Sequence, residues 1–181
     1  MKKVAILAAP GFEEIELMAP LDILRRLNMD VVLAGVQSDK VVSTHEVTVS
    51  TDTMLDKLHA DKLDALILPG GAGSWVLRDT PEVIHLVKKM HEAGKLVAAI
   101  CAAPSVLASL GLLEGKNATA HAGFQDQLAG AIVHDEEVVV DGNITTSYGL
   151  GGAIPFALEL VRQLAGQAEA DRIQNAIAYR H

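Results

Sequence analysis

The chain has 181 residues, of which 50% are hydrophobic and 21% are charged. This length suits one domain with a full core, and the hydrophobic share is too high for a disordered chain. The formal net charge of -8 argues against nucleic acid as a partner, because an acidic surface repels phosphate backbones. The sequence has no apolar stretch of the ~20 residues that a membrane span requires, so no membrane partner is expected. The one cysteine excludes an internal disulfide framework and a cysteine-based zinc cluster, and the chain is expected to be cytoplasmic.

Short apolar strands alternate with amphipathic helices in the N-terminal half. We expect strands over residues 4–8, 31–36 and 63–68, and a first helix over residues 15–27. The segment 41–50 alternates in polarity, with Val47 and Val49 expected to face inward. This alternation predicts an edge excursion or a hairpin.

The same alternation continues in the C-terminal half. A helix is expected over residues 81–93, where Pro81 suits the first turn and Gly94 ends the helix. An apolar strand over residues 96–100 follows, then a helix over residues 105–110. The turn Asp141-Gly142-Asn143 predicts a hairpin between residues 138–140 and 144–146. Two further helices are expected over residues 156–164 and 168–178.

Apolar strands separated by amphipathic helices imply a mostly parallel sheet with helices on both faces. The sequence therefore predicts a flavodoxin-like three-layer α/β sandwich, with residues 1–181 forming a single domain. In such sheets ligands bind at the carboxyl ends of the strands. Three segments fall at such ends, namely residues 10–16, 69–71 and 100–104.

Cys101 is the first candidate catalytic residue, because it directly follows a buried strand and precedes a helix. Such a sharp turn resembles a nucleophile elbow and predicts a sparsely populated backbone conformation. The free amides of a helix start favour the thiolate, so we expect a thiol pKa below ~7. The alternative is a buried structural cysteine that packs as a small hydrophobe.

Backbone amides near this cysteine are candidates for an oxyanion hole. Gly70 and Gly71 follow Pro69 at the end of the neighbouring strand, and Ala102 follows the cysteine. Amides at these positions can stabilise a developing negative charge. The alternative for the two glycines is a simple tight turn. No phosphate-binding loop follows the first strand.

An acidic residue and a histidine complete the candidate site. Glu16 lies at the start of the first helix with Glu13 and Glu14, where acids also compensate the helix dipole. If Glu16 faces the crevice, burial and a nearby thiolate raise its pKa, so it stays protonated and donates a hydrogen bond. Of seven histidines, His121 is preferred because it follows a short strand-like segment over residues 118–120 and its loop can reach the crevice. The alternative is a structural histidine. No histidine has convincing metal-ligand spacing with carboxylates, and no metal site is expected.

Several stretches together resemble the ThiJ/PfpI superfamily, in the branch of the parkinsonism-associated deglycase. They span nearly the whole chain, over residues 4–7, 11–16, 64–71, 97–104, 145–149 and 156–158. The resemblance matches the family's essential thiol to Cys101, its protonated glutamate to Glu16, its pocket histidine to His121 and its glycine amide to Gly71. Three departures change the expected pattern: Ala102 stands where peptidase-like members have histidine, Tyr148 alters a pocket wall, and a common arginine near the dimer partner is replaced around His45.

The resemblance implies a cofactor-free, cysteine-dependent enzyme that acts on reactive dicarbonyls. It would be a glutathione-independent glyoxalase or protein deglycase, converting methylglyoxal to lactate or acting on glycated substrates, with Glu16 or His121 as the base. The second interpretation is an oxidative-stress sensor or redox-regulated chaperone that acts through oxidation of Cys101, and the third is an intracellular peptidase or amidase. The resemblance also implies a homodimer, for which Met18 and Leu21 of the first helix are the expected contact.

Overall fold

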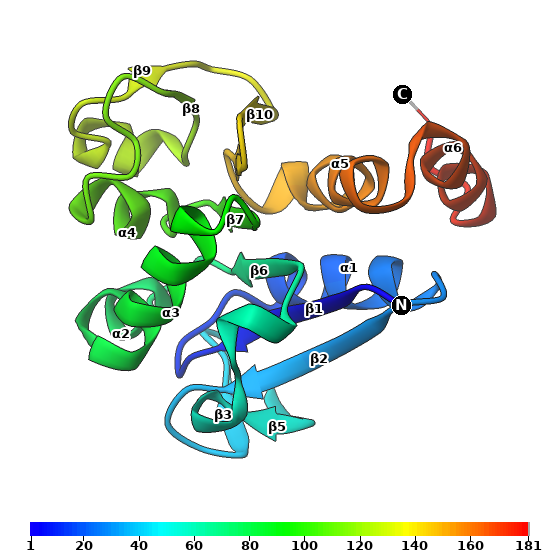
Figure 1. Cartoon of the computed structure of the whole chain (residues 1–181), viewed down its shortest axis with the longest axis horizontal. Helices are drawn as coiled ribbons and strands as arrows, with labels where there is room; N and C mark the ends of the chain where they lie inside the picture. Colours follow the sequence, from blue (N-terminus) through cyan, green and yellow to red (C-terminus); the bar gives the residue numbers. More distant parts are fainter. Residues whose placement is uncertain (181) are drawn as a thin grey trace.

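A mixed, mostly parallel sheet forms the middle of the molecule (Figure 1). The computed structural model describes residues 1–180, and His181 lies outside them. The strands of this sheet are β1 (Lys3–Ala8), β2 (Asp30–Gly35), β5 (Thr53–Met54), β6 (Ala65–Leu68), β7 (Leu96–Ile100), β10 (Val138–Asp141) and β11 (Ile144–Ser147). Their order is β10-β11-β7-β6-β1-β2-β5. Only the edge pair β10–β11 is antiparallel.

Helices cover both faces of this sheet. The α-helices are α1 (Glu14–Arg25), α2 (Gly73–Asp79), α3 (Pro81–Glu92), α4 (Pro104–Ser109), α5 (Ala153–Ala165) and α6 (Gln167–Ala176). Short 3₁₀ helices are η1 (Leu55–Lys57), η2 (Ala60–Lys62), η3 (Ala122–Gln127) and η4 (Leu150–Gly152). Figure 1 shows α1 and α5 together on one side, with α6 at the end of α5, and α2, α3 and α4 on the other side.

Two hydrophobic cores, one on each face, explain why the strands are apolar throughout. Successive side chains of a strand point to opposite faces. In β1, Val4 and Ile6 join the core under α1 and α5, whereas Ala5 and Leu7 join the core under α3 and α4. All four are completely buried. The predicted flavodoxin-like three-layer sandwich is confirmed.

The edge region and the connections contain the differences from the sequence prediction. Residues 41–50 form the predicted hairpin, from β3 (Lys40–Val42) and β4 (Thr48–Ser50). The inward orientation expected for Val47 is wrong, because this side chain is exposed and lies in the turn region before β4. Helix α2 is not predicted by the sequence, since its first residue is a glycine only two positions after a Pro-Gly-Gly turn. A small parallel pair, β8 (Asn117–Ala118) and β9 (Ile132–Val133), was also missed in part, because only a strand-like segment at 118–120 was expected.

The strand order places a topological switch point beside β1. From β1 the chain goes to β2 on one side, and it later returns to β6 on the other side. Since β1, β6, β7 and β11 are adjacent and parallel, the segments that follow them meet at one edge of the sheet. Ligands of such sheets bind in the crevice at this edge.

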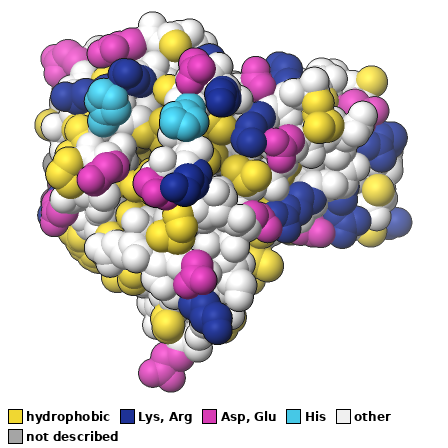
Figure 2. Space-filling view, turned by 60° about the horizontal axis from the view of Figure 1, so that its bottom comes forward, with side chains coloured by type: hydrophobic (Ala, Val, Ile, Leu, Met, Phe, Trp, Pro, Cys, Tyr) yellow, Lys and Arg dark blue, Asp and Glu magenta, His cyan; other side chains and the backbone are white. Residues whose placement is uncertain are grey.

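Acidic and basic side chains are interspersed on the face of the molecule that Figure 2 shows. Hydrophobic side chains lie between them, and the lobe at the right, where α6 lies in Figure 1, carries charges of both signs. Within residues 1–180, no helix has both the length and the hydrophobicity to cross a bilayer.

Candidate active site

Cys101 lies in a strained turn between β7 and α4. Its φ is +65°, a left-handed conformation that costs a non-glycine residue about 1–2 kcal/mol. Backbone hydrogen bonds fix the turn, because the Cys101 N–H donates to the Ser147 carbonyl (2.9 Å) and the Cys101 carbonyl accepts from the His121 N–H (3.0 Å). The expected sparsely populated conformation is confirmed. The strain indicates that the side chain is held in a set direction.

Glu16 lies on the first turn of α1 and points into the molecule, with 1% of its surface exposed. The Gly70 N–H donates to its Oε2 atom (3.0 Å), and a hydrogen bond joins its carboxyl group to the Cys101 thiol. Burial raises the pKa of Glu16 to about 7, and these hydrogen bonds only partly oppose that rise. The expected pairing of Glu16 with the thiol and its raised pKa are both confirmed.

The thiol itself departs from the sequence prediction. Burial, followed by the charge of Glu16 and its hydrogen bond, raises the pKa of Cys101 to about 12. The amides of Gly71 and Ala102 lower it, but by less. A thiol pKa below ~7 was therefore the wrong expectation, because desolvation and the neighbouring carboxylate outweigh the amides. The two groups titrate as a pair, which loses its first proton near pH 7 and retains the second proton well above neutral pH.

The predicted backbone donors divide into two groups. Gly71 and Ala102 direct their amides at the thiol. The Gly70 amide instead donates to Glu16, so its assignment to the oxyanion hole was wrong. Gly70 allows close packing, since a Cβ there would lie 2.5 Å from Glu16 Oε2 and 2.6 Å from the Cys101 Cβ. A glycine is thus required for the carboxyl group to reach the thiol.

His121 borders the same space as the thiol. A Cβ built on Gly149 would lie 3.8 Å from Cys101 Sγ and 3.5 Å from His121 Cδ2. The ring is exposed, and its Nδ1 accepts a hydrogen bond from the Gly123 N–H (3.2 Å). In the neutral ring the proton is then on Nε2, which can donate to a substrate oxygen. The structure therefore brings Cys101, Glu16 and His121 together.

The two neighbouring acids serve other purposes. Glu13 caps α1 by accepting from the Glu16 N–H (2.8 Å). Glu14 binds the β3–β4 hairpin, where it accepts from the Ser43 hydroxyl and from the backbone N–H (2.8 Å) and ring Nδ1 (2.9 Å) of His45. The hydrogen bond with His45 is the main cause that lowers the pKa of Glu14 to about 2. Although side-chain atoms of Glu13, Glu14 and His45 lie within 4.8 Å of one another, both acids already accept hydrogen bonds from the protein.

Comparison with known proteins decides the family. The profile of the DJ-1/PfpI family matches residues 2–163. The chain belongs to the DJ-1/PfpI family. Protein dj-1beta of Drosophila melanogaster is 37% identical over 180 residues, which are 97% of this chain and 96% of that protein. A Thermococcus kodakarensis protein named deglycase is 39% identical over 164 residues, which are 90% of this chain and 99% of that protein.

Solved structures agree with this family. The crystal structure of a cysteine-to-alanine mutant of a DJ-1 superfamily protein from Salmonella typhimurium has a TM-score of 0.94 and 39% identity, and the match covers 100% of both chains. The resemblance inferred from the sequence motifs is confirmed. Because several relatives are named deglycase, they support an enzyme function of the deglycase type for this DJ-1/PfpI protein.

Two contributions to the site were not predicted. The Leu150 amide also hydrogen-bonds to the Glu16 carboxyl group, and Gly149 before it has a φ of +146°. In the sequence, only the glycines on either side of Leu150 could have indicated this contact.

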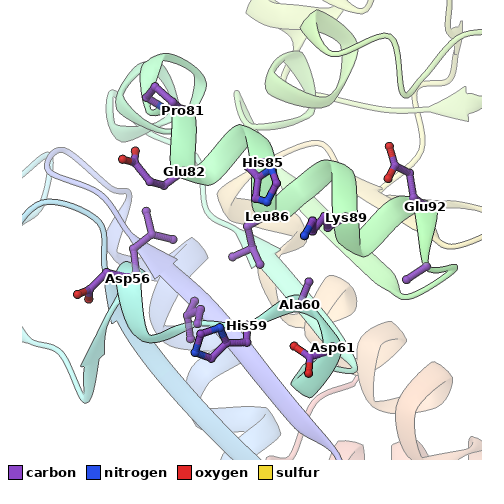
Figure 3. Close-up of a pocket in the computed structure, with 13 residues that line it drawn as sticks. Asp56, His59, Ala60, Asp61, Pro81, Glu82, His85, Leu86, Lys89 and Glu92 are labelled. Atoms are coloured by element: carbon purple, nitrogen blue, oxygen red, sulfur yellow. The ribbon is translucent and has the colours of Figure 1, made fainter.

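A groove of about 880 Å³ lies elsewhere, between the η1–η2 segment and α3 (Figure 3). None of the three candidate catalytic residues lines this groove.

Proposed function

We propose that this DJ-1/PfpI protein is a cofactor-independent enzyme that converts reactive dicarbonyls such as methylglyoxal to hydroxy acids such as lactate. The single observation that carries this proposal is the buried Cys101–Glu16 pair, in which a carboxyl group with a pKa of about 7 is hydrogen-bonded to the thiol. Such a pair can supply a nucleophile and a proton carrier from one site. The deglycase names of several relatives support the same chemistry on glycated thiols or amines.

The first step is addition of the thiol to the aldehyde. When the shared proton is on Glu16, the Cys101 thiolate attacks the aldehyde carbon of methylglyoxal and forms a carbon–sulfur bond. The carbonyl oxygen gains the electron pair and then takes the proton from Glu16, which gives a hemithioacetal and leaves Glu16 deprotonated. The amides of Gly71 and Ala102, which already point at the sulfur, would stabilise the developing oxyanion.

The second step moves hydrogen between the two substrate carbons. Deprotonated Glu16 is suited to remove the proton from the thiol-bearing carbon, because its pKa of about 7 matches a general base at neutral pH. The resulting enediolate takes this proton back from Glu16 at the neighbouring carbon. The hydroxyl proton of the thiol-bearing carbon passes to the second oxygen, which yields a thioester of the hydroxy acid. Donation from Nε2 of His121 to the second oxygen would assist this transfer. Water then hydrolyses the thioester, releasing lactate and the thiol.

The test is lactate formation from methylglyoxal by the purified protein, followed by NMR in deuterated water. We expect lactate from the wild type and none from Cys101→Ala. Glu16→Gln keeps the size of the side chain but removes the base, so we expect a loss of about 10²–10⁴-fold in turnover. Equal activity of the wild type and Cys101→Ala would contradict the proposal. Circular dichroism of each variant controls for folding.

The same geometry favours one second candidate function, a redox sensor. A protonated Glu16 can donate to the oxygens of an oxidised Cys101, and the amides of Gly71 and Ala102 can do the same. With hydrogen peroxide as oxidant, we expect mass spectrometry to show the addition of two oxygen atoms at Cys101 without further oxidation. Glu16→Leu removes the donor and should allow oxidation to the sulfonic acid. Identical product ratios in both proteins would exclude this role for Glu16.

A further inference from the structure

An aromatic row extends outward from His121, a residue of the proposed active site. The Phe124 ring lies against His121, with the ring centroids 6.3 Å apart and an interplanar angle of 66°. On its other side, Phe124 lies 5.9 Å from the Trp75 ring. We name His121, Phe124 and Trp75 the aromatic row. Its first member borders the same space as the Cys101 sulfur.

Two elements position this row next to the reacting atoms. Trp75 is on the first turn of α2, four residues after Gly71, whose amide faces the thiol. Phe124 is on η3, where its N–H donates to the His121 carbonyl (2.7 Å). Both α2 and η3 pack against α4, the helix that follows Cys101. The rings are therefore fixed relative to the nucleophile.

The exposure of these rings distinguishes them from the aromatic side chains of the core. It has one Trp, three Phe and two Tyr. The two other phenylalanines, Phe12 and Phe156, are completely buried in the core, whereas Trp75 remains 43% exposed and Phe124 is half-buried. Aromatic rings that are not buried in the core, yet are held beside a reactive group, indicate a binding surface for a flat apolar group.

We propose that Trp75 and Phe124 bind the substituent of the substrate, and that the enzyme prefers 2-oxoaldehydes with an aryl substituent to methylglyoxal. This inference rests on the proposed function. With the aldehyde carbon at Cys101, the substituent beyond the second carbonyl extends over the row. A phenyl group gains ring contacts there that the methyl group of methylglyoxal is too small to make, so its kcat/KM should be roughly five- to tenfold higher.

The test compares phenylglyoxal with methylglyoxal as substrates. We expect the wild type to prefer phenylglyoxal, and Trp75→Leu and Phe124→Leu to lose that preference, measured as the ratio of kcat/KM for the two substrates. Trp75→Phe keeps a ring and should retain the preference. Ile132→Ala, which truncates an exposed apolar residue on β9 outside the row, should leave it unchanged. Equal kcat/KM values in the wild type, or a preference that survives both leucine variants, would overturn the inference.

A binding measurement separates failure of the inference from failure of the proposed function. Trp75 is the one tryptophan of the chain, so its fluorescence reports on the row directly. In Cys101→Ala, mandelate should quench this fluorescence saturably and lactate should not. If neither aldehyde is turned over but mandelate quenches, the reaction is wrong and the aryl subsite stands. If mandelate and lactate have the same effect on the fluorescence, the proposed aryl subsite is wrong, whichever reaction the enzyme catalyses.

Discussion

At the scale of single residues, the Glu16 carboxyl group sets the chemistry of the site. It is buried, yet the groups that contact it can accommodate either protonation state: the amides of Gly70 and Leu150 stabilise its charge, and the thiol of Cys101 exchanges a proton with it. Loss of the first proton from this pair gives two forms, a thiol beside a carboxylate and a thiolate beside a carboxylic acid. Only the second form is nucleophilic.

The pH dependence of thiol reactivity follows from this pair. In the wild type we expect the rate of alkylation by iodoacetamide to rise with an apparent pKa near 7 and then to level off, because this is where Glu16 and Cys101 lose their first proton. Glu16→Leu removes that step, so burial should leave a thiol pKa above the ordinary 9.0. Glu16→Gln keeps a donor without a charge and should have a lower thiol pKa than Glu16→Leu. Coincident profiles for all three proteins would contradict the pairing.

Stability should depend on the same carboxyl group. The pKa of Glu16 rises from 4.5 to about 7 on folding, so the folded protein binds its proton more tightly than the unfolded chain. This contribution is fully present below pH 4.5 and is lost as pH rises through 7. At about 1.4 kcal/mol per pKa unit, roughly 2–4 kcal/mol of the free energy of unfolding is lost. Urea unfolding at about pH 5 and about pH 8 should show this loss in the wild type and a smaller one in Glu16→Gln. Equal losses in the two proteins would exclude Glu16 as the cause.

At the scale of elements, the turn from β7 to α4 concentrates strain at the residue that carries the function. Cys101 has a φ of +65°, whereas Ala102 and Ala103 after it lead into α4 at Pro104. A glycine at this position has no Cβ, so it avoids the clash between Cβ and the backbone carbonyl oxygen that strains other residues in the left-handed conformation. The strain should therefore be measurable as a difference in the free energy of unfolding between variants at this position.

A matched pair of substitutions isolates this strain. Cys101→Gly should be about 0.5–1 kcal/mol more stable than Cys101→Ala, because only glycine adopts the left-handed conformation without a penalty. Ala98→Gly in the middle of β7 is the control, and there glycine should destabilise by about 0.5–1 kcal/mol. Both values come from urea unfolding. If Cys101→Gly is less stable than Cys101→Ala, the turn stores no strain.

Which of these elements the sequence predicts depends on how local their causes are. Strand β7 and the turn after it can be predicted from five apolar residues that lead directly to Cys101. The position of Glu16 at the crevice can be predicted because it follows β1 in the chain. The direction of the Gly70 amide could not be predicted, because its partner Glu16 lies 54 residues away. The prediction of the thiol pKa was wrong because this pKa also depends on distant parts of the chain. It is set by how completely the folded protein excludes water around Cys101.

At the scale of the whole molecule, apolar side chains remain exposed on α1, on η4 and at the start of α5. Ile15 and Met18 of α1 are 48% and 44% exposed, and Leu150 and Ile154 are also exposed. Helices α1 and α5 pack against each other. Leu21, the other contact expected from the sequence, is buried in the core under α1, so it is not available to a partner. The surface that remains is suited to a second copy of this chain.

A homodimer is therefore the expected assembly. Sedimentation at micromolar concentration should give twice the 19.1 kDa mass of the chain, since specific stable interfaces usually persist there. Met18→Lys should shift the equilibrium to the monomer, because it places a charge in an apolar contact. Ile132→Lys on β9 is the control and should remain a dimer. A wild type that sediments only at 19.1 kDa would rule out this assembly.

The parallel order β1-β6-β7 also has a consequence for how the protein matures. The carboxyl group, the glycine turn and the thiol follow three different strands, β1, β6 and β7. These strands are separate in the chain and become adjacent only when the sheet has formed. Such long-range pairings form late, after the cost of loop closure has been met. A newly synthesised chain thus carries an ordinary solvated cysteine until β7 docks beside β6. The altered reactivity of Cys101 is acquired at that moment, so its time course during refolding would report the closing of the sheet.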